Sequence, residues 1–77
     1  MTARYSKQAR KFLEKQGVES ESRIRKAVDK LPLGDVLKMS GYSDRYRLRI
    51  GDYRLIFTKE DNVIFVRKIE NRGQAYK

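Results

Sequence analysis

The most regular alternation of polar and apolar positions lies between residues 45 and 57. Its first half alternates three basic with three apolar residues, namely Arg45, Tyr46, Arg47, Leu48, Arg49 and Ile50. Successive side chains of a β-strand point to opposite faces of the sheet. This half therefore predicts a strand with one basic and one apolar face.

The second half predicts a strand that returns beside the first. Gly51-Asp52 is a typical two-residue turn between such strands. After it, alternation places three residues on the apolar face, namely Tyr53, Leu55 and Phe57. Arg54 falls on the opposite face. We therefore expect a β-hairpin that carries Arg47, Arg49 and Arg54 together on one side.

Helical spacing replaces alternation nearer the start of the chain. Ser6 precedes a run with apolar residues at Ala9, Phe12 and Leu13, so it is expected to cap a first helix. Gly17 is the expected left-handed residue after this helix, and Val18 is expected to pack back onto it.

A second helix is expected to follow, capped by Ser20 and ended by Pro32. Its apolar positions fall at helical spacing, namely Ile24, Ala27, Val28 and Leu31. Together the two segments predict a helical hairpin with a narrow apolar stripe.

The remaining segments complete a predicted α+β domain over residues 1–77. We expect a short strand at residues 3–5, a connector at 33–44 with Leu37 and Met39 beneath it, a turn at 59–62 and a strand at 63–69. The order is β-α-α-β-β-β, with the helical hairpin covering one face of an antiparallel sheet. Three further aromatic residues are assigned to the core, namely Tyr5, Phe12 and Phe65.

Composition narrows the class of partner and of chemistry. The 77 residues include 19 basic and 10 acidic ones, for a net charge of +9, which favours a nucleic acid or an acidic protein as partner. Cysteine and histidine are absent, which excludes the usual zinc sites and imidazole acid–base chemistry, and no cofactor is expected. No segment is apolar enough to span a membrane, and no signal region is evident, so a cytoplasmic location is expected.

The arginine face of the hairpin allows two interpretations. Charged residues on an exposed strand face often serve only to prevent edge pairing between molecules. However, like charges at neighbouring cross-strand positions repel, and a bound anion would relieve that repulsion. Guanidinium forks match phosphate oxygens, so the second interpretation indicates a phosphate-rich partner.

Three segments resemble the RelE branch of the RelE/ParE superfamily, the toxins of bacterial type II toxin–antitoxin systems. They are Lys30-Leu31-Pro32 with Val36-Leu37-Lys38, the run from Tyr46 to Phe57, and Ile69-Glu70-Asn71-Arg72-Gly73-Gln74-Ala75-Tyr76-Lys77. The last is similar to the closing His-Arg-Gly-x-x-Tyr-Lys pattern of the family, with Asn71 where histidine is common. Their order and spacing fit the family over essentially the whole chain.

The resemblance implies a RelE-like microbial RNase fold and metal-independent, ribosome-dependent cleavage of mRNA, which stops translation. It also implies a cognate acidic antitoxin that binds the toxin in a hetero-oligomer. The family's catalytic positions fall on Arg47, Arg49, Arg54, Arg72 and Tyr76. Two rival functions stay open: a ParE-type toxin that poisons DNA gyrase without being an enzyme, and an inactive basic RNA-binding module.

Overall fold

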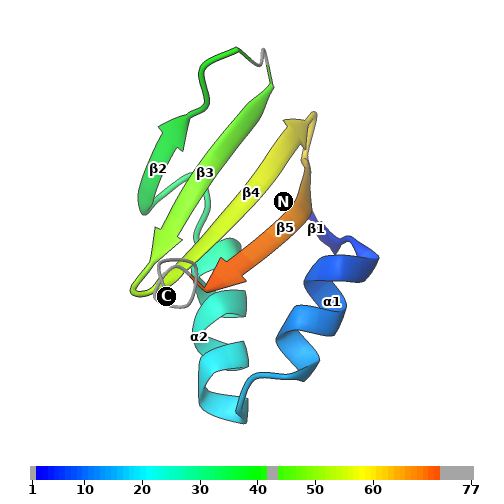
Figure 1. The fold of residues 1–77 in the computed structure, drawn as a ribbon. Coiled ribbons are helices and arrows are strands. Elements are labelled where there is room, and N and C mark those ends of the chain that lie inside the picture. The colour runs from blue at the N-terminus through cyan, green and yellow to red at the C-terminus, as the bar shows by residue number, and fades with distance from the viewer. Residues whose placement is uncertain (1, 42–43, 72–77) are drawn as a thin grey trace.

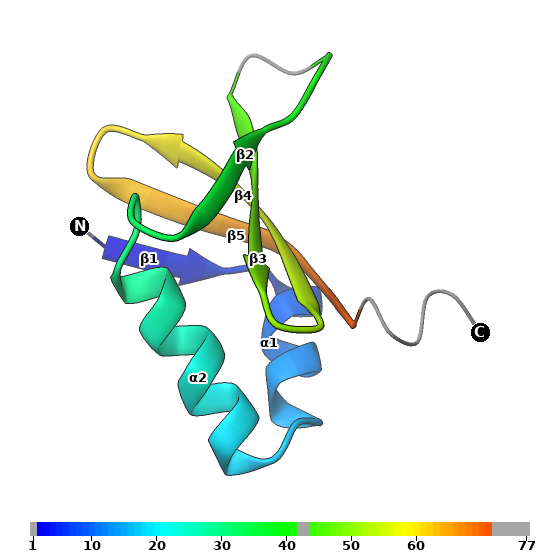
Figure 2. The ribbon, with the colours of Figure 1, turned by 90° about the vertical axis from the view of Figure 1, so that its left-hand side faces the viewer.

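The computed structural model describes residues 2–41 and 44–71. It contains a five-stranded sheet in the order β1-β5-β4-β3-β2. The strands are β1 (Thr2–Tyr5), β2 (Asp35–Lys38), β3 (Arg45–Ile50), β4 (Tyr53–Glu60) and β5 (Val63–Asn71). The helices α1 (Lys7–Glu14) and α2 (Val18–Asp29) lie on the same side of this sheet (Figures 1 and 2).

The predicted α+β architecture, a helical hairpin packed on a sheet, is confirmed. The sheet also includes a strand that was not expected, because the connector at 33–44 contains β2, in which Val36 pairs with Leu48 and Leu37 with Arg47. Leu37 is 56% exposed and therefore does not pack beneath the connector as expected. β1 runs parallel to β5, while the other pairs are antiparallel.

The start of α1 agrees with the prediction, but the start of α2 does not. Ser6 caps α1 by accepting a hydrogen bond from the Ala9 backbone N–H at 3.1 Å. Gly17 has φ −67° and ψ 162°, so it is the extended residue before α2 rather than a left-handed residue after α1. Helix α2 consequently begins at Val18, which is 86% exposed, and Ser20 already lies inside the helix.

The core lies between the helices and the apolar face of the sheet. Its buried members are Ala9, Leu13, Ile24, Val28, Leu31, Leu48, Ile50, Leu55, Phe57, Ile64, Val66 and Ile69. Tyr46 stacks on Phe57 with ring centroids 5.4 Å apart, and Phe12 meets Tyr53 edge-on at 5.9 Å. These contacts confirm the apolar face predicted for the 45–57 hairpin, whose turn has Gly51 at φ +57°.

Phe65 was expected in the core, and this assignment is wrong. Its neighbours Ile64 and Val66 are both buried in the core. A residue between two such positions in a strand points to the opposite face. Phe65 is therefore a half-buried aromatic residue on the face that the helices leave uncovered.

Strand β5 contains a β-bulge that changes its register against β4. Phe57 pairs with Val66, whereas the preceding residue Ile56 pairs with Lys68, so Arg67 is the extra residue. Beyond the bulge, Ile69 faces the core, where it is buried.

Side chains from α1 and its cap hold the strand at the bulge. The Ser6 hydroxyl donates to the Arg67 carbonyl at 2.7 Å, and the Ser6 backbone N–H donates to Val66 at 2.9 Å. The Gln8 side-chain amide both donates to the Ile69 carbonyl and accepts from the Ile69 N–H, at 3.1 Å each. The start of α1 is thereby fixed to the bulged part of β5.

Ser6→Ala is expected to lower the free energy of unfolding by about 1–2 kcal/mol, because it removes both the helix cap and the hydrogen bond to Arg67. Ser20→Ala is the matched control and should change stability by less than about 0.5 kcal/mol, since Ser20 caps nothing. Urea unfolding of the two variants measures the difference. Equal losses would contradict the assignment of the caps.

Candidate functional site

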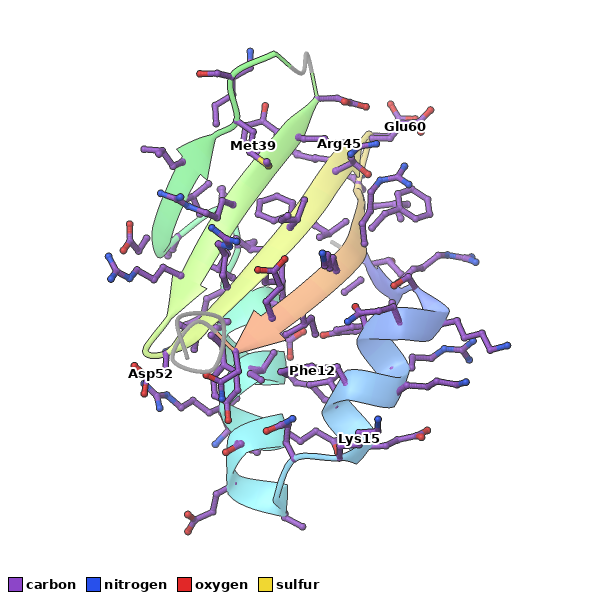
Figure 3. All side chains as sticks on the ribbon, in the orientation of Figure 1. Phe12, Lys15, Met39, Arg45, Asp52 and Glu60 are labelled. Atoms are coloured by element: carbon purple, nitrogen blue, oxygen red, sulfur yellow. The ribbon has the colours of Figure 1, made fainter. Side chains whose placement is uncertain are left out.

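The sheet face opposite the helices, called here the open face, carries three rows of side chains that cross the strands in register. The first row is Asp35, Arg49, Arg54 and Glu70. The second row is Leu37, Arg47, Ile56 and Lys68. The third row is Arg45, Thr58, Phe65 and Arg4. Figure 3 shows Arg45 and Met39 near one end of the sheet and Asp52, in the β3–β4 turn, near the other.

Basic side chains dominate these rows. They comprise Arg4, Arg45, Arg47, Arg49, Arg54 and Lys68, against the acidic Asp35 and Glu70. The two carboxylates stand at opposite ends of the first row, on strands β2 and β5. The face therefore presents an excess of positive charge that favours an anionic partner.

Arg47 and Arg54 share a pocket of about 290 Å³ on the open face. Its other lining residues are Leu37, Lys38, Met39, Ser40 and Ile56. Two guanidinium groups over an apolar floor suit a ligand that combines a phosphate with a less polar body.

Glu70 holds the Arg54 guanidinium in place. The Arg54 Nη2 atom donates to the Glu70 Oε2 atom at 2.6 Å, and the Lys68 Nζ atom lies 3.0 Å from Oε1. The hydrogen bonds from Arg54 and then Lys68 lower the pKa of the Glu70 carboxyl below its ordinary value. Glu70 is consequently a carboxylate at neutral pH, and it fixes one side of the Arg54 fork.

The Nε atom of Arg54 is buried and has no hydrogen-bond partner within residues 2–41 and 44–71. A buried donor without an acceptor costs about 1–3 kcal/mol. Such a group calls for a specific explanation, such as strain, a catalytic role or a bound ion. The Arg54 side chain as a whole is 34% exposed, so an incoming anion can approach the exposed part of the guanidinium, although the Nε atom is shielded.

Sequence reasoning missed Glu70, and the bulge explains why. Counting back from the turn pair Glu60–Val63 without a bulge would place Ile69, not Glu70, opposite Arg54. A signal was present in the sequence, because the buried residues Ile64, Val66 and Ile69 step by two and then by three. A break of this kind in strand alternation is typical of a bulge.

The structure brings some of the expected site residues together and separates others. Arg47 and Arg54 line the same pocket. Arg49 pairs with Arg54 across the strands, but it lines a different hollow, with Asp35 and the α2 residue Arg23 among its neighbours. Arg72 and Tyr76 lie outside the described residues.

The described part of the chain contains neither a cluster of metal ligands nor a helix suited to cross a membrane. Across residues 2–41 and 44–71, no group of three or more acidic, histidine or cysteine side chains could hold a metal ion. None of the helices described has both the length and the apolar character needed to cross a membrane.

Glu70→Gln is expected to lower the free energy of unfolding at pH 7 by about 0.5–1 kcal/mol, because it removes an ion pair that is partly exposed to solvent. The pKa of Glu70 is lower in the folded state than its ordinary value of 4.5. The ion pair therefore stabilises the fold fully at pH values above 4.5, and this contribution is lost as the pH falls through the lowered folded-state pKa. Urea unfolding between pH 7 and pH 3 should therefore show wild type and variant converging in acid. The exposed Glu14→Gln is the control. A difference between wild type and Glu70→Gln that stays constant with pH would refute this role.

Comparisons with known proteins support the same family. Residues 3–76 match the family model described as ParE toxin of type II toxin-antitoxin system, parDE. Comparison with curated protein sequences gives no significant match.

Solved structures share the fold over nearly the whole chain. A chain of the RelE–RelB complex from Pyrococcus horikoshii is 31% identical, with a TM-score of 0.75 over 95% of this chain and 96% of that one. A chain of the RelB–RelE antitoxin–toxin complex from Methanococcus jannaschii is 25% identical, with a TM-score of 0.73 over 94% and 93%. YoeB from Staphylococcus aureus, solved as a dimer, is 24% identical and shows the fold alone, with a TM-score of 0.67 over 88% and 92%.

The family-model match spans nearly the whole chain, and the Pyrococcus structure matches it at more than 30% identity. The protein belongs to the RelE branch of the RelE/ParE superfamily and is a toxin of a type II toxin–antitoxin system.

Proposed function

We propose that this toxin is a metal-independent endoribonuclease that cleaves mRNA on the ribosome and so inhibits translation. The observation that carries the proposal is the pair Arg47 and Arg54 in one pocket of the open face, in a chain whose structural neighbours belong to RelE–RelB complexes. A cytoplasmic location follows from such a target.

The proposed reaction is attack of an RNA 2′-hydroxyl on the adjacent phosphate, with release of a strand that begins with a 5′-hydroxyl. Its transition state carries extra negative charge on the phosphorane oxygens. Charged donors held in place before the reaction stabilise such charge most effectively, because they need no reorganisation. Glu70 gives Arg54 this fixed position, and Arg47 approaches from the neighbouring strand.

Proton transfer is assigned to the segment after β5. Glu70 is a poor base, because Arg54 and Lys68 lower its pKa. We propose Tyr76 as the general base, since nearby arginines would favour its phenolate form and lower its pKa from about 10. Arg72 is assigned to the leaving-group side, and Arg49 to a phosphate that flanks the cleaved bond. The ribosome would supply much of the rate by holding the mRNA in line.

The proposed partner in the resting state is a cognate acidic antitoxin, bound in a hetero-oligomer. Two structural neighbours come from complexes of a toxin with its antitoxin. The net charge of +9 suits an acidic protein as well as RNA.

A second candidate is a ParE-type gyrase inhibitor that is not an enzyme. The matching family model, which is described as a ParE toxin, favours it. The Arg47 and Arg54 pocket favours the ribonuclease, since inhibition without phosphate chemistry does not require two guanidiniums, one of them fixed by Glu70, in one pocket. Mapping of mRNA 5′ ends after induced expression separates the two, because only the ribonuclease creates new ends within codons.

Arg54→Ala is expected to abolish growth inhibition and the new mRNA 5′ ends. Loss of one fixed charge-stabilising donor reduces turnover by roughly 10²–10³-fold. Arg25→Ala is the matched control, because Arg25 pairs with Glu21 on α2, away from the open face. It should leave toxicity unchanged.

A thermal melt accompanies the Arg54 variant, so that loss of folding is distinguished from loss of chemistry. If Arg54→Ala folds and still inhibits growth like wild type, the pocket is not the active site. If wild type creates no new mRNA 5′ ends while gyrase is poisoned, the second candidate replaces the first.

Tyr76→Phe is expected to keep ribosome binding and to lose at least tenfold in cleavage, since a general base supplies about 10²–10⁴-fold. If Tyr76 only stacks on a base, phenylalanine would serve equally well and Tyr76→Ala would lose affinity instead. Single-turnover cleavage by programmed ribosomes compares wild type with both variants. A fully active Tyr76→Phe would exclude Tyr76 as the base.

A further inference from the structure

We infer that the open face carries a second nucleotide subsite, in which Phe65 stacks on an unpaired RNA base between arginines that bind the neighbouring phosphates. The inference deepens the proposed function and rests on it for the position of the cleaved bond. The occupant is single-stranded RNA that continues out of the Arg47 and Arg54 pocket.

The subsite is a hollow of about 470 Å³ at the β1–β5 side of the sheet. The residues that matter in its lining are Phe65, Arg4 and Arg67 from the open face and Arg10 from helix α1, so the hollow reaches round the edge of the sheet. All three arginines are exposed, while Phe65 is half-buried. The Arg67 Nε atom donates to the Thr58 hydroxyl at 3.1 Å, which holds this side chain beside the hollow.

An aromatic ring on this face needs an explanation, because the helices cover only the other face. Phe65 is absent from the core cluster and from the partly buried residues packed against it. Arg4 is its direct partner on β1 and Thr58 its partner on β4, so the ring stands between a basic and a polar residue. Aromatic residues on open sheet faces among basic side chains are typical platforms for unpaired bases.

The hollow and the proposed active site share no lining residue, but they are joined by a row of side chains along β4 and β5. Phe65 pairs with Thr58, which follows Arg54 by four residues on β4. Four residues of strand span about 13 Å. A stacked strand with bases about 3.4 Å apart covers that distance in roughly four nucleotides, and an extended strand needs fewer. Lys68 and Arg67 lie on β5 between Glu70 and Phe65, so basic side chains line the path.

The experiment measures binding of the full chain to single-stranded 2′-O-methyl RNA, which cannot be cleaved through a 2′-hydroxyl. Fluorescein-labelled oligonucleotides of two and six nucleotides serve as probes, with fluorescence anisotropy at low salt. The six-nucleotide probe can span both sites, whereas the two-nucleotide probe reaches only one at a time. Wild type should therefore bind the longer probe more tightly.

Phe65→Leu keeps an apolar residue but removes the flat ring, and it should weaken binding of the six-nucleotide probe by at least about fivefold. Phe65→Tyr keeps the ring and should bind it like wild type. Arg54→Ala should weaken both probes. Because no cleavage is measured, the Phe65 effect would survive even if the protein proved not to be a ribonuclease.

Three results would overturn the subsite. The first is equal affinity of wild type for the two probes. The second is wild-type affinity of Phe65→Leu for the longer one. The third is a loss that Phe65→Tyr shares with Phe65→Leu, which would mean that the ring does not stack on a base.

Discussion

The bulge in β5 is the constraint on which both faces of the sheet depend. A shift of one residue exchanges the two faces of a strand. On the Val66 side of the bulge, Ile64 and Val66 meet the core; on the other side, Ile69 does so only because Arg67 is the extra residue. The same shift brings Glu70 opposite Arg54 and Lys68 opposite Ile56. Without it, a charged residue would face the core and Ile69 would face water. The Ser6 hydroxyl, which binds the extra residue Arg67, and the Gln8 amide, which binds Ile69 beyond it, therefore matter for the site as much as for α1.

The sequence predicted the elements whose signals are local and repeated. The 45–57 hairpin combines strict alternation with a glycine turn, and Ser6 places a capping hydroxyl at the start of a helical run. The structure departs from prediction where tertiary context decides. Strand β2 is only four residues long, and its pairing with β3 rather than its own pattern defines it. Gly17 was expected to follow the first helix but precedes the second, and Phe65 was expected in the core but lies on the other face of β5. The position of Glu70 opposite Arg54 depends on the register shift at the bulge, which counting residues from the β4–β5 turn does not reveal.

Electrostatics in the site differ from what the arginine pattern alone suggests. Arg49 and Arg54 are direct cross-strand partners, an arrangement that like charges disfavour. The protein offsets part of this repulsion itself, since Asp35 and Glu70 stand at the ends of the same row. Repulsion between arginines is thus weaker support for a bound anion than it seemed. The shared pocket of Arg47 and Arg54 is stronger support, because it presents two guanidinium groups to one ligand.

The parallel pairing of β1 with β5 has a consequence for how the toxin is made. β5 is the last element described, yet it lies between β1 and β4 and also receives hydrogen bonds from Ser6 and Gln8. The first strand to leave the ribosome therefore has no sheet partner, and the start of α1 lacks its hydrogen bonds to β5, until residues 63–71 have been synthesised. Contacts between such distant segments form late, because the intervening loop must close first. A chain interrupted before residue 63 lacks Glu70 and the strand that joins β1 to the rest of the sheet, so it has neither the complete sheet nor the ion pair that holds Arg54.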